Sequence, residues 1–495
     1  MNRQELVHVA AALALGGASW FVVNLDPVWM LAWFVPGLVL VLALKSEGWS
    51  SRGLVALAAL VGAASNYRYF LSVMPMGWAL LVLLLQTLMW MLIYGNARRI
   101  VKSYQRAWTV LALPVVAVAV DTLLAHFTPD GNWGSLAYTQ AQVLPIAQLA
   151  SVFGVGGVLF LLMLGNSAVA LALAYGRRLP GALPMYVAVL ITIGAAFGFG
   201  WWRLADAPDP AAMAGAVNVG MASVDNFIAG PRSTDSAEVW AQYEAQVLAL
   251  AGSGARLVLL PEKIAVLEQA DAEQREAWLG GLARANRVWL VAGVGVVENG
   301  TRRNEAWWFA PDGRRVTNYL KHHLAPPERD FVPGHEFAVN VIDGVPYGVA
   351  ICKDMHFSSY GRELGRRHAA VVLVPAWDFV RDAEMAANMT KMRGIESGFA
   401  VVRSSREGLL SVTDPYGRVL AVARSDKLPG TTLLATLVPG PQVTTIYTRI
   451  GDAPGWACVL AAISWVLAAH WRVRRARIVA ELGVSPTSGP PAASG

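Results

Sequence analysis

Long apolar runs dominate the first 205 residues of this 495-residue chain, and they restrict its possible folds more than any other feature. A helix needs about 20 mainly apolar residues to cross the hydrocarbon core of a bilayer. Only 15% of the residues are charged, against roughly 25% in soluble domains. We predict transmembrane spans at about 6–24, 27–44, 53–71, 76–95, 107–127, 148–175, 183–203 and 454–471. The sequence therefore predicts a polytopic α-helical membrane protein with about eight spans.

The composition changes between the seventh predicted span and the eighth. Residues 210–440 have the balance of polar and apolar residues that is typical of a globular domain. We therefore expect a seven-span transmembrane domain at 1–205, a soluble domain at 210–440 and an eighth transmembrane helix at 454–471. A basic tail follows at 472–495, and its end, rich in Ser, Pro, Gly and Ala, is expected to be disordered.

Lys and Arg residues are distributed unequally over the two ends of the predicted spans, and cytoplasmic loops are the ones enriched in them. One side carries Arg3, Lys45, Arg52, Arg98, Arg99, Lys102, Arg106, Arg177, Arg178, Arg472, Arg474, Arg475 and Arg477. The other side has only Arg68 and Arg203 beside its spans. We therefore expect both termini in the cytoplasm and residues 204–453 outside. This topology also accounts for the net charge of +6, so a nucleic-acid partner is not expected.

The first span has a basic start followed by an apolar stretch, which is also typical of a cleaved signal peptide. No convincing A-x-A cleavage site follows it. Removal of this span would also invert the charge pattern, so we expect it to be retained.

Short β-rich runs alternate with helical patterns in the soluble region. We expect helices at 237–251 and 272–286, and strands at 217–222, 256–260, 288–297, 304–309, 347–351, 370–374, 400–404, 409–412 and 433–437. This alternation predicts a layered α/β domain. Functional groups in such domains gather at the carboxyl ends of the strands.

Three reactive side chains, Glu262, Lys321 and Cys352, each follow an apolar strand directly. Taken singly, each has an ordinary structural explanation: a helix cap, a solvated strand end and a small core residue. The second cysteine, Cys458, lies inside the last predicted span and cannot reach Cys352. A single thiol outside the cytoplasm is unusual, because cysteines there are normally paired. We therefore predict that Cys352 is a nucleophile.

These residue types together suit covalent catalysis. A carboxylate such as Glu262 can take the proton of a thiol, and an ammonium such as Lys321 can stabilise a thiolate or a tetrahedral oxyanion. The histidines do not suggest a metal site, since His322 and His323 point to opposite faces of an extended segment and His356 lacks further ligands. We expect neither a metal nor a cofactor.

The order Glu, Lys, Cys resembles the nitrilase superfamily, whose fold is an αββα sandwich. The segments that carry the resemblance are 260–262 (Leu-Pro-Glu), 319–326 (Tyr-Leu-Lys-His-His-Leu-Ala-Pro) and 351–352 (Ile-Cys). With seven preceding spans and one following, the chain is similar to the apolipoprotein N-acyltransferase family over about 1–471. The segments 133–140 and 148–151 resemble an outer loop of that family's membrane domain.

The resemblance implies an enzyme of the cell inner membrane, with its catalytic domain on the periplasmic side. An acyl chain would pass from a phospholipid to Cys352 as a thioester, and then to the N-terminal amine of a diacylglyceryl-modified apolipoprotein. Glu262 would act as general base and acid, Lys321 would stabilise the oxyanion, and Glu328 would support the site. The resemblance implies no cofactor, and we expect a monomer.

The residues after the nucleophile depart from the family pattern. Lys353 and Asp354 stand where the family usually has an aromatic residue and a glutamate, and Cys-x-Asp is closer to soluble amidases. A membrane-tethered amidohydrolase, or an N-acyltransferase for a different amine or amide, therefore stays open as the alternative. Lys353 itself either lowers the pKa of the thiol or is solvated.

Other residues have two interpretations each. Asp121, near the outer end of the fifth predicted span, is either functional or a structural hydrogen-bond partner. Four aromatic residues either line a groove for an acyl chain or pack in a core, namely Trp307, Trp308, Trp377 and Phe379.

Overall fold

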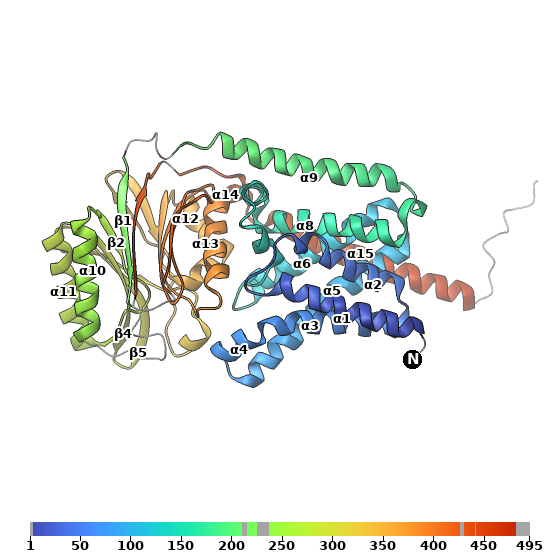
Figure 1. Cartoon of the computed structure of the whole chain (residues 1–495), viewed down its shortest axis with the longest axis horizontal. Helices are drawn as coiled ribbons and strands as arrows, with labels where there is room; N and C mark the ends of the chain where they lie inside the picture. The colour runs from blue at the N-terminus through green and yellow to red at the C-terminus, as the bar shows by residue number, and fades with distance from the viewer. Residues whose placement is uncertain (1–2, 210–214, 225–236, 426–429, 441, 482–495) are drawn as a thin grey trace, which may run out of the picture.

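The chain folds into two parts, a layer of long helices and a pair of stacked β-sheets, which lie end to end (Figure 1). The computed structural model describes residues 3–209, 215–224, 237–425, 430–440 and 442–481. The end of the chain that is predicted to be disordered lies outside these residues.

Seven helices of the helical part are long and apolar enough to cross a membrane. They comprise α1 (Arg3–Val23), α3 (Gly48–Ala63) with α4 (Tyr67–Val73), α5 (Met76–Tyr104), α6 (Ala112–Phe127), α8 (Ala150–Ala174), α9 (Ala182–Ala205) and α15 (Ala453–Glu481). The predicted span at 27–44 is a shorter apolar stretch, Leu31–Lys45, whose main part is α2 (Val35–Lys45). It is interrupted because the backbone of Phe34 leaves the helical region (φ −128°, ψ −43°).

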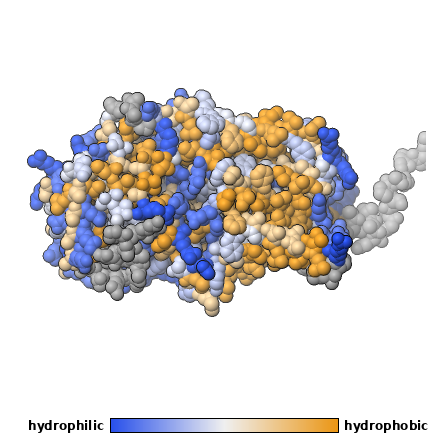
Figure 2. All heavy atoms as spheres, viewed as in Figure 1, coloured by the Kyte–Doolittle hydropathy of each residue, from blue (hydrophilic) through white to orange (hydrophobic). Residues whose placement is uncertain are grey.

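These helices run alternately toward the sheets and away from them. At the end near the sheets, the Tyr69 hydroxyl donates to Asp382 of the sheet domain at 2.9 Å. At the far end, Arg98 Nε donates to the carbonyl of Ala43 at 2.6 Å. Both α1 and α15 have their outer ends there (Figure 1). Hydrophobic residues cover much of the visible face of this part, and hydrophilic residues gather at its far end (Figure 2).

The sheet domain has the αββα layering that was predicted. One sheet has the strand order β13-β1-β2-β4-β5-β6, with β3 paired to β4, and the other has the order β12-β11-β10-β9-β8-β7. The first sheet contains β1 (Val217–Ser223), β2 (Leu257–Leu259), β3 (Val266–Glu268), β4 (Trp289–Glu298), β5 (Thr301–Phe309), β6 (Arg315–Leu320) and β13 (Thr431–Leu437). The second contains β7 (Val339–Ile342), β8 (Val345–Val349), β9 (Val371–Trp377), β10 (Ala400–Arg406), β11 (Leu409–Thr413) and β12 (Val419–Arg424).

The central strands of both sheets are parallel, so their carboxyl ends meet at one edge. In the first sheet, Leu259 of β2 is in register with Met221 of β1 and Val291 of β4. In the second, Val349 of β8 pairs with Leu373 of β9. Val, Leu and Ala residues of the two inner faces form one buried core between the sheets. This packing holds the ends of β2, β6 and β8 close together.

Helices cover the outer faces of both sheets (Figure 1). The first sheet is covered by α10 (Ala237–Gly252) and α11 (Gln269–Asn286). The second is covered by α12 (Ser358–Arg366) and α13 (Ala383–Ser397), and α13 lies between this sheet and the helical part. Met385, Met389 and Met392 of α13 belong to the same apolar core as the membrane helices. The two parts of the chain therefore share a core.

Candidate active site

Glu262 lies just past the end of β2, where two contacts fix its backbone. Its N–H donates to the carbonyl of Ala376, at the end of β9 in the other sheet, at 3.2 Å. Gly293 of β4 allows the close approach, since a Cβ there would lie 2.6 Å from the Cα of Glu262. The Glu262 side chain is only 2% exposed.

Lys321 lies directly after β6, and its side chain is 1% exposed. Its Nζ donates to Glu262 Oε1 at 2.7 Å and to Glu328 Oε2 at 2.8 Å. Burial disfavours the charged form of this ammonium, but the charges of Glu262 and Glu328 outweigh it and hold the pKa of Lys321 well above its usual value. Lys321 is therefore a charged group in a buried site.

Glu328 accepts four hydrogen bonds from Lys321 and the residues around it. It accepts from Lys321, from Lys263 Nζ at 2.5 Å and from Asn304 Nδ2 at 2.6 Å. It also accepts from the N–H of Ala325 at 2.8 Å. Although burial opposes ionisation, Lys321 and Lys263 hold the pKa of Glu328 well below its usual value. Two carboxylates and two ammonium groups thus balance in charge.

Asn304 and Lys263 are site residues to which the sequence analysis gave no role. Asn304 is fully buried, and its amide donates to Glu262 and Glu328 at 2.6 Å each, which bridges the two carboxylates. Nothing in the sequence around Asn304 marks it, because it lies inside a strand. Lys263 directly follows Glu262, and this adjacency was the one available signal.

Cys352 follows β8 at a sharp turn. Its backbone adopts a positive φ of 43°, which is uncommon for a residue with a side chain. Such positions are often found at functional sites. The thiol donates to the carbonyl of Trp377 at 3.5 Å. Burial, joined by the negative charge of Glu262, raises the pKa of the Cys352 thiol above its usual value, so the resting thiol keeps its proton.

Asp354 organises the turn around Cys352. It accepts from the N–H of Ile351 at 2.9 Å, from the N–H of His323 at 2.8 Å and from the hydroxyl of Tyr319 at 2.7 Å. It is fully buried. The loop that carries Cys352 and the loop that carries Lys321 are therefore fastened to each other by one carboxylate.

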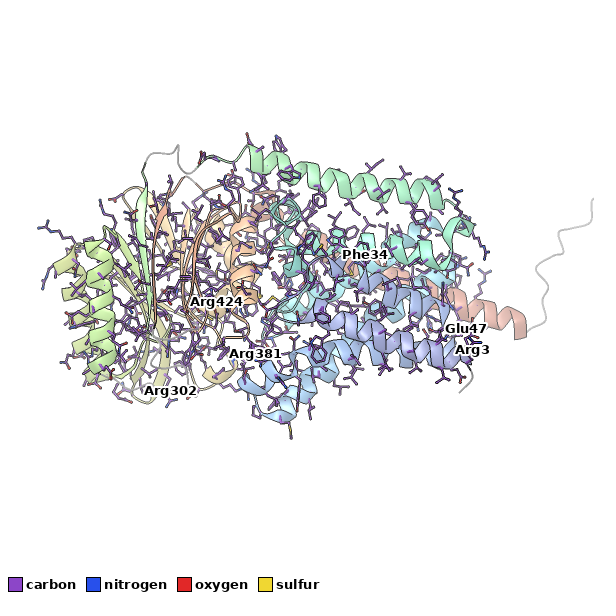
Figure 3. The ribbon with its side chains drawn as sticks, viewed as in Figure 1. Arg3, Phe34, Glu47, Arg302, Arg381 and Arg424 are labelled. Carbon is purple, nitrogen blue, oxygen red and sulfur yellow. The ribbon has the colours of Figure 1, made fainter. Side chains whose placement is uncertain are left out.

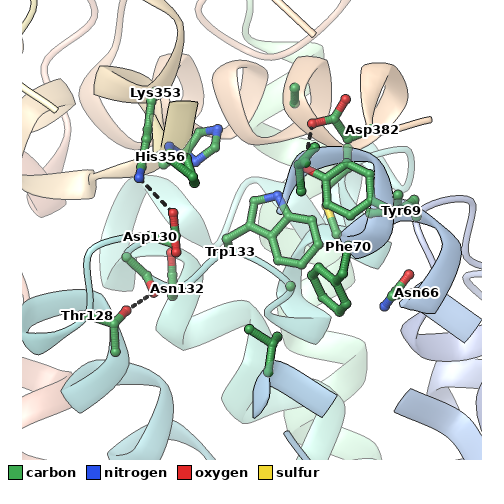
Figure 4. Close-up of a pocket in the computed structure, with 18 of the residues that line it drawn as sticks. Asn66, Tyr69, Phe70, Thr128, Asp130, Asn132, Trp133, Lys353, His356 and Asp382 are labelled. Atoms are coloured by element: carbon green, nitrogen blue, oxygen red, sulfur yellow. Dashed lines mark hydrogen bonds and ion pairs between the residues drawn. The ribbon is translucent and has the colours of Figure 1, made fainter. Parts of the chain in front are cut away.

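The Lys353 side chain reaches toward Asp130 of the helical part (Figure 4). Its Nζ pairs with Asp130, in the loop after α6, at 2.7 Å, and donates to the carbonyl of Leu324 at 3.0 Å. Its side chain is 5% exposed. Of the two interpretations, the solvated one is therefore wrong, because the ammonium is buried in an ion pair.

A cavity of about 730 Å³ connects this site with the interior of the helical part. Glu262, Lys321 and Cys352 lie along its wall in the sheet domain. The opposite wall comes from the helices and the loop between α6 and α8, and includes Phe70, Trp90, Leu124, Trp133 and Leu159. A thiol in the wall of a largely apolar cavity is suited to a substrate with a long apolar chain.

A second contact joins the helical part to the sheet domain on the side of this cavity opposite Lys353 (Figure 4). There, Tyr69 donates to Asp382 and stacks on Trp133, with ring centroids 5.5 Å apart. Asp382 also accepts from the N–H of Phe379 at 2.8 Å. Burial and the neighbouring Asp378 raise the pKa of Asp382 to about 6.

The residues with two interpretations separate clearly. Trp377 and Phe379 line the cavity, whereas Trp307 and Trp308 are each 1% exposed and pack in the cores of the sheet domain. Asp121 accepts a hydrogen bond from Asn132 Nδ2 at 3.0 Å and also lines the cavity.

Comparisons with known proteins agree with both halves of this architecture. Residues 218–440 match the carbon-nitrogen hydrolase family, and residues 14–168 match the apolipoprotein N-acyltransferase N-terminal domain. The apolipoprotein N-acyltransferase of Geobacter metallireducens is 24% identical over 391 residues, which cover 71% of this chain and 73% of that protein. The enzyme of the same name from Bradyrhizobium diazoefficiens is 27% identical over 429 residues, with 75% of each chain covered.

Two amidases also match part of this chain. An (R)-stereoselective amidase from Pseudomonas sp is 30% identical over 156 residues, which cover 29% of this chain and 57% of the amidase. The structure of an amidase from Nesterenkonia sp. AN1 covers 48% of this chain and 95% of that one, with 20% identity and a TM-score of 0.41.

The N-terminal match falls on the membrane helices, and the carbon-nitrogen hydrolase match falls on the sheet domain. The matches to the two apolipoprotein N-acyltransferases cover 73% and 75% of those proteins. The chain therefore belongs to the apolipoprotein N-acyltransferase family, as a membrane protein with a nitrilase-like catalytic domain.

Proposed function

We propose that the protein transfers an acyl chain from a phospholipid, through a thioester on Cys352, to the N-terminal amine of a diacylglyceryl-modified apolipoprotein. The observation that carries the proposal is the cavity that joins Cys352, Glu262 and Lys321 to the space between the membrane helices. A soluble substrate would need no such connection.

In the first step, Glu262 accepts the proton of the Cys352 thiol as the sulfur attacks the ester carbonyl of the phospholipid. The resting thiol is protonated and Glu262 is ion-paired, so both groups start in the form that this step requires. When the tetrahedral intermediate collapses, Glu262 returns the proton to the departing glycerol oxygen. A lysophospholipid leaves, and the acyl group remains on sulfur.

Lys321 supplies the positive charge that the intermediate needs. An ammonium has three N–H groups. Glu262 and Glu328 take two of them, which leaves one, as far as the described residues go, for the oxyanion. The two carboxylates hold Lys321 in place, and Asn304 holds the carboxylates. The remaining N–H group can therefore stabilise the oxyanion with little movement of the site during the reaction.

In the second step, the amine of the acceptor attacks the thioester. Glu262 takes a proton from the attacking nitrogen and returns one to the departing sulfur, so the product is an amide and Cys352 is a thiol again. The acceptor carries two acyl chains of its own. It would reach the thioester from the same apolar cavity after the lysophospholipid has left.

We also propose that the catalytic domain lies on the periplasmic side of the inner membrane and that both termini are cytoplasmic. The basic residues predicted to be cytoplasmic include Arg52, Arg98, Arg99 and Lys102, which lie together at the far end of the helical part. The rule that positive loops stay inside supports this orientation.

A second candidate, amide hydrolysis or transfer to a different amine, is favoured by the similarity of part of the chain to the (R)-stereoselective amidase. The two candidates differ in what resolves the thioester. Purified protein would be incubated with a phospholipid that carries an alkyne-labelled acyl chain, and then with a diacylated lipopeptide. The proposal expects labelled protein first and labelled lipopeptide afterwards.

The control is Cys352→Ala, which should take up no label. Label that persists in this variant would exclude the covalent mechanism. Label that forms on the wild type but is released only as free fatty acid would exclude the lipopeptide acceptor and favour the hydrolase.

A further inference from the structure

A second cavity of about 620 Å³ lies at the end of the helical part that is farthest from the sheets. It is formed by the end of α2, the beginning of α3, the second half of α5 and one residue of α15, Val473. None of its lining residues lines the catalytic cavity. Glu47, which lies beside it, is labelled at this end in Figure 3.

Four cationic side chains converge on this cavity, namely Arg52, Arg98, Arg99 and Lys102. Among the lining residues that the structure describes, none carries a carboxylate. The nearby Glu47 reaches Lys102 at 4.0 Å, but its side chain is 91% exposed and lies outside the cavity. The cavity therefore concentrates positive charge.

Arg98 also has a structural role at this cavity. Its Nε donates to the carbonyl of Ala43 at 2.6 Å, and its Nη2 donates to the carbonyl of Ser46 at 3.0 Å. These contacts cap the carboxyl end of α2. Carbonyl groups do not neutralise the guanidinium, so its charge still contributes to the cavity.

Membrane topology alone does not explain this arrangement. It requires cations at the cytoplasmic end, but not that they surround one hollow. Arg106, Arg177 and Arg178 also lie at the predicted cytoplasmic ends of spans, and they are exposed and do not line the cavity. Like charges gathered around a half-enclosed space repel one another, and an anion between them lowers their energy.

The walls indicate what kind of anion fits. Val55, Met91, Leu92 and Val473 give the cavity an apolar side, and Leu92 is 51% exposed on the outer surface of α5, where a membrane helix faces lipid. A ligand with a negatively charged head and apolar tails would satisfy both the cations and this side. A zwitterionic head would place its own ammonium group among four cations.

We propose that this cavity binds the headgroup of an anionic phospholipid, with its phosphodiester between Arg52, Arg99 and Lys102 and its acyl chains along Leu92. Basic hollows between membrane helices on the cytoplasmic side are suited to such headgroups. The site is separate from the acyl-donor cavity, so this lipid is a bound partner and not a substrate.

The test is a titration of the full-length protein in detergent, followed by native mass spectrometry. The ligand is phosphatidylglycerol with ether-linked chains, because an ether cannot donate an acyl group to Cys352. The variant is the triple substitution Arg52→Gln, Arg99→Gln, Lys102→Gln. Its matched control, Arg106→Gln, Arg177→Gln, Arg178→Gln, removes the same charge from the same end but outside the cavity.

We expect the control to bind the lipid as the wild type does. The triple variant should bind it on the order of 100-fold more weakly, because each cation contributes about fivefold. Ether-linked phosphatidylcholine should bind all three proteins equally weakly. Because the catalytic cavity is intact in every protein, lipid bound there cancels in the comparison. Equal loss of binding in variant and control would overturn the proposal, since it would indicate only surface attraction.

Inorganic phosphate distinguishes a lipid from a free anion. At concentrations equal to those of the lipid it should displace nothing, and displacement of the lipid would indicate a phosphate site instead. Alkylation of Cys352 at the wild-type rate shows that the triple variant is folded. If that variant does not fold, the single substitution Arg99→Gln should still weaken lipid binding about fivefold.

Discussion

The balance of charge around Lys321 predicts how the site responds when one carboxylate is neutralised. Glu262 and Glu328 carry two negative charges, and Lys321 and Lys263 carry two positive charges. The side chains of Lys321 and Glu328 are 1% and 2% exposed, and the side chain of Lys263 is 11% exposed. The substitution Glu328→Gln keeps the shape of the side chain but leaves one buried positive charge in excess.

Breaking a buried ion pair by removing one partner costs about 3–5 kcal/mol, because the other charge stays buried without compensation. We expect Glu328→Gln to lower the stability of the protein by this amount. Lys321 would also lose one of the contacts that orient it. The rate of acyl-enzyme formation should then fall by about 100-fold to 1000-fold, which is the usual cost of a lost oxyanion donor.

The diagnostic variant is the double substitution Glu328→Gln, Lys263→Met. It restores charge neutrality, because Lys321 then faces Glu262 alone. We expect the double variant to recover on the order of 1–3 kcal/mol relative to the sum of the two single variants. Thermal unfolding in detergent measures stability, and labelling of Cys352 by an alkyne phospholipid measures the rate.

Asp312→Asn is the control, since Asp312 pairs with Arg314 on the surface and should change neither measurement. Strict additivity of the two site substitutions would refute the reasoning. It would mean that Lys263 and Lys321 do not share the charge of Glu328 as their contacts indicate.

Three further predictions concern the joint between the two domains. Lys353→Met and Asp130→Asn should each slow acyl-enzyme formation about tenfold, because each removes the same ion pair. The double variant should be no slower than either single variant, and an unchanged rate in Asp130→Asn would contradict this prediction. Tyr69→Phe should lower the unfolding free energy by about 1 kcal/mol, because Asp382 loses a hydrogen bond; no change in a chemical-denaturation curve would count against it. Burial and Asp378 raise the pKa of Asp382 from 3.8 to about 6. Its favourable contribution to the free energy of unfolding is therefore complete below pH 3.8 and is lost as the pH rises through 6. Between pH 4 and pH 7, the melting temperature should fall more steeply with pH for the wild type than for Asp382→Asn.

The sequence predicted the parts of the fold that depend on local pattern. The strand at 217–222 is β1 (Val217–Ser223), and the helix at 237–251 is α10 (Ala237–Gly252). Long apolar runs likewise predicted about eight spans, and seven helices in the described part of the chain are long and apolar enough to cross a membrane. In these elements, hydrophobic period and length alone decide the structure.

Elements that depend on tertiary packing were missed. Helix α13 (Ala383–Ser397) was not predicted because it is buried on nearly every side, so its polar and apolar residues are not separated onto two faces. Its fully buried Arg393 and Glu396 are polar at positions where a core is expected. They are accommodated because Arg393 pairs with Glu396 and also donates to Tyr138 of the outer loop at 2.7 Å.

The same distinction applies to the site. Glu262, Lys321 and Cys352 could be singled out because each reactive group directly follows an apolar strand. Asn304 could not, because its role depends on Glu262 and Glu328, which lie 42 and 24 residues away. Contacts of that kind leave no local signal in one sequence.

The contacts of the two residues after Cys352 change how these residues are interpreted. On sequence alone, Lys353 and Asp354 raise doubt about the acceptor. Yet the Asp354 carboxylate is occupied by the N–H groups of Ile351 and His323 and by the Tyr319 hydroxyl, and Lys353 pairs with Asp130. Neither side chain is placed to choose between an amine and water.

Both residues fix the position of the turn that carries Cys352. Asp354 sets the position of the Cys352 turn relative to the loop that carries Lys321, and Lys353 sets the position of that turn relative to the membrane helices. Selection of the acceptor must then depend on groups that line the cavity and have no partner in the catalytic cluster, such as Trp133 and Phe70. A change of acceptor should accordingly follow substitutions in the helical wall of the cavity, and not substitutions at Asp354, which should reduce all acyl transfer alike.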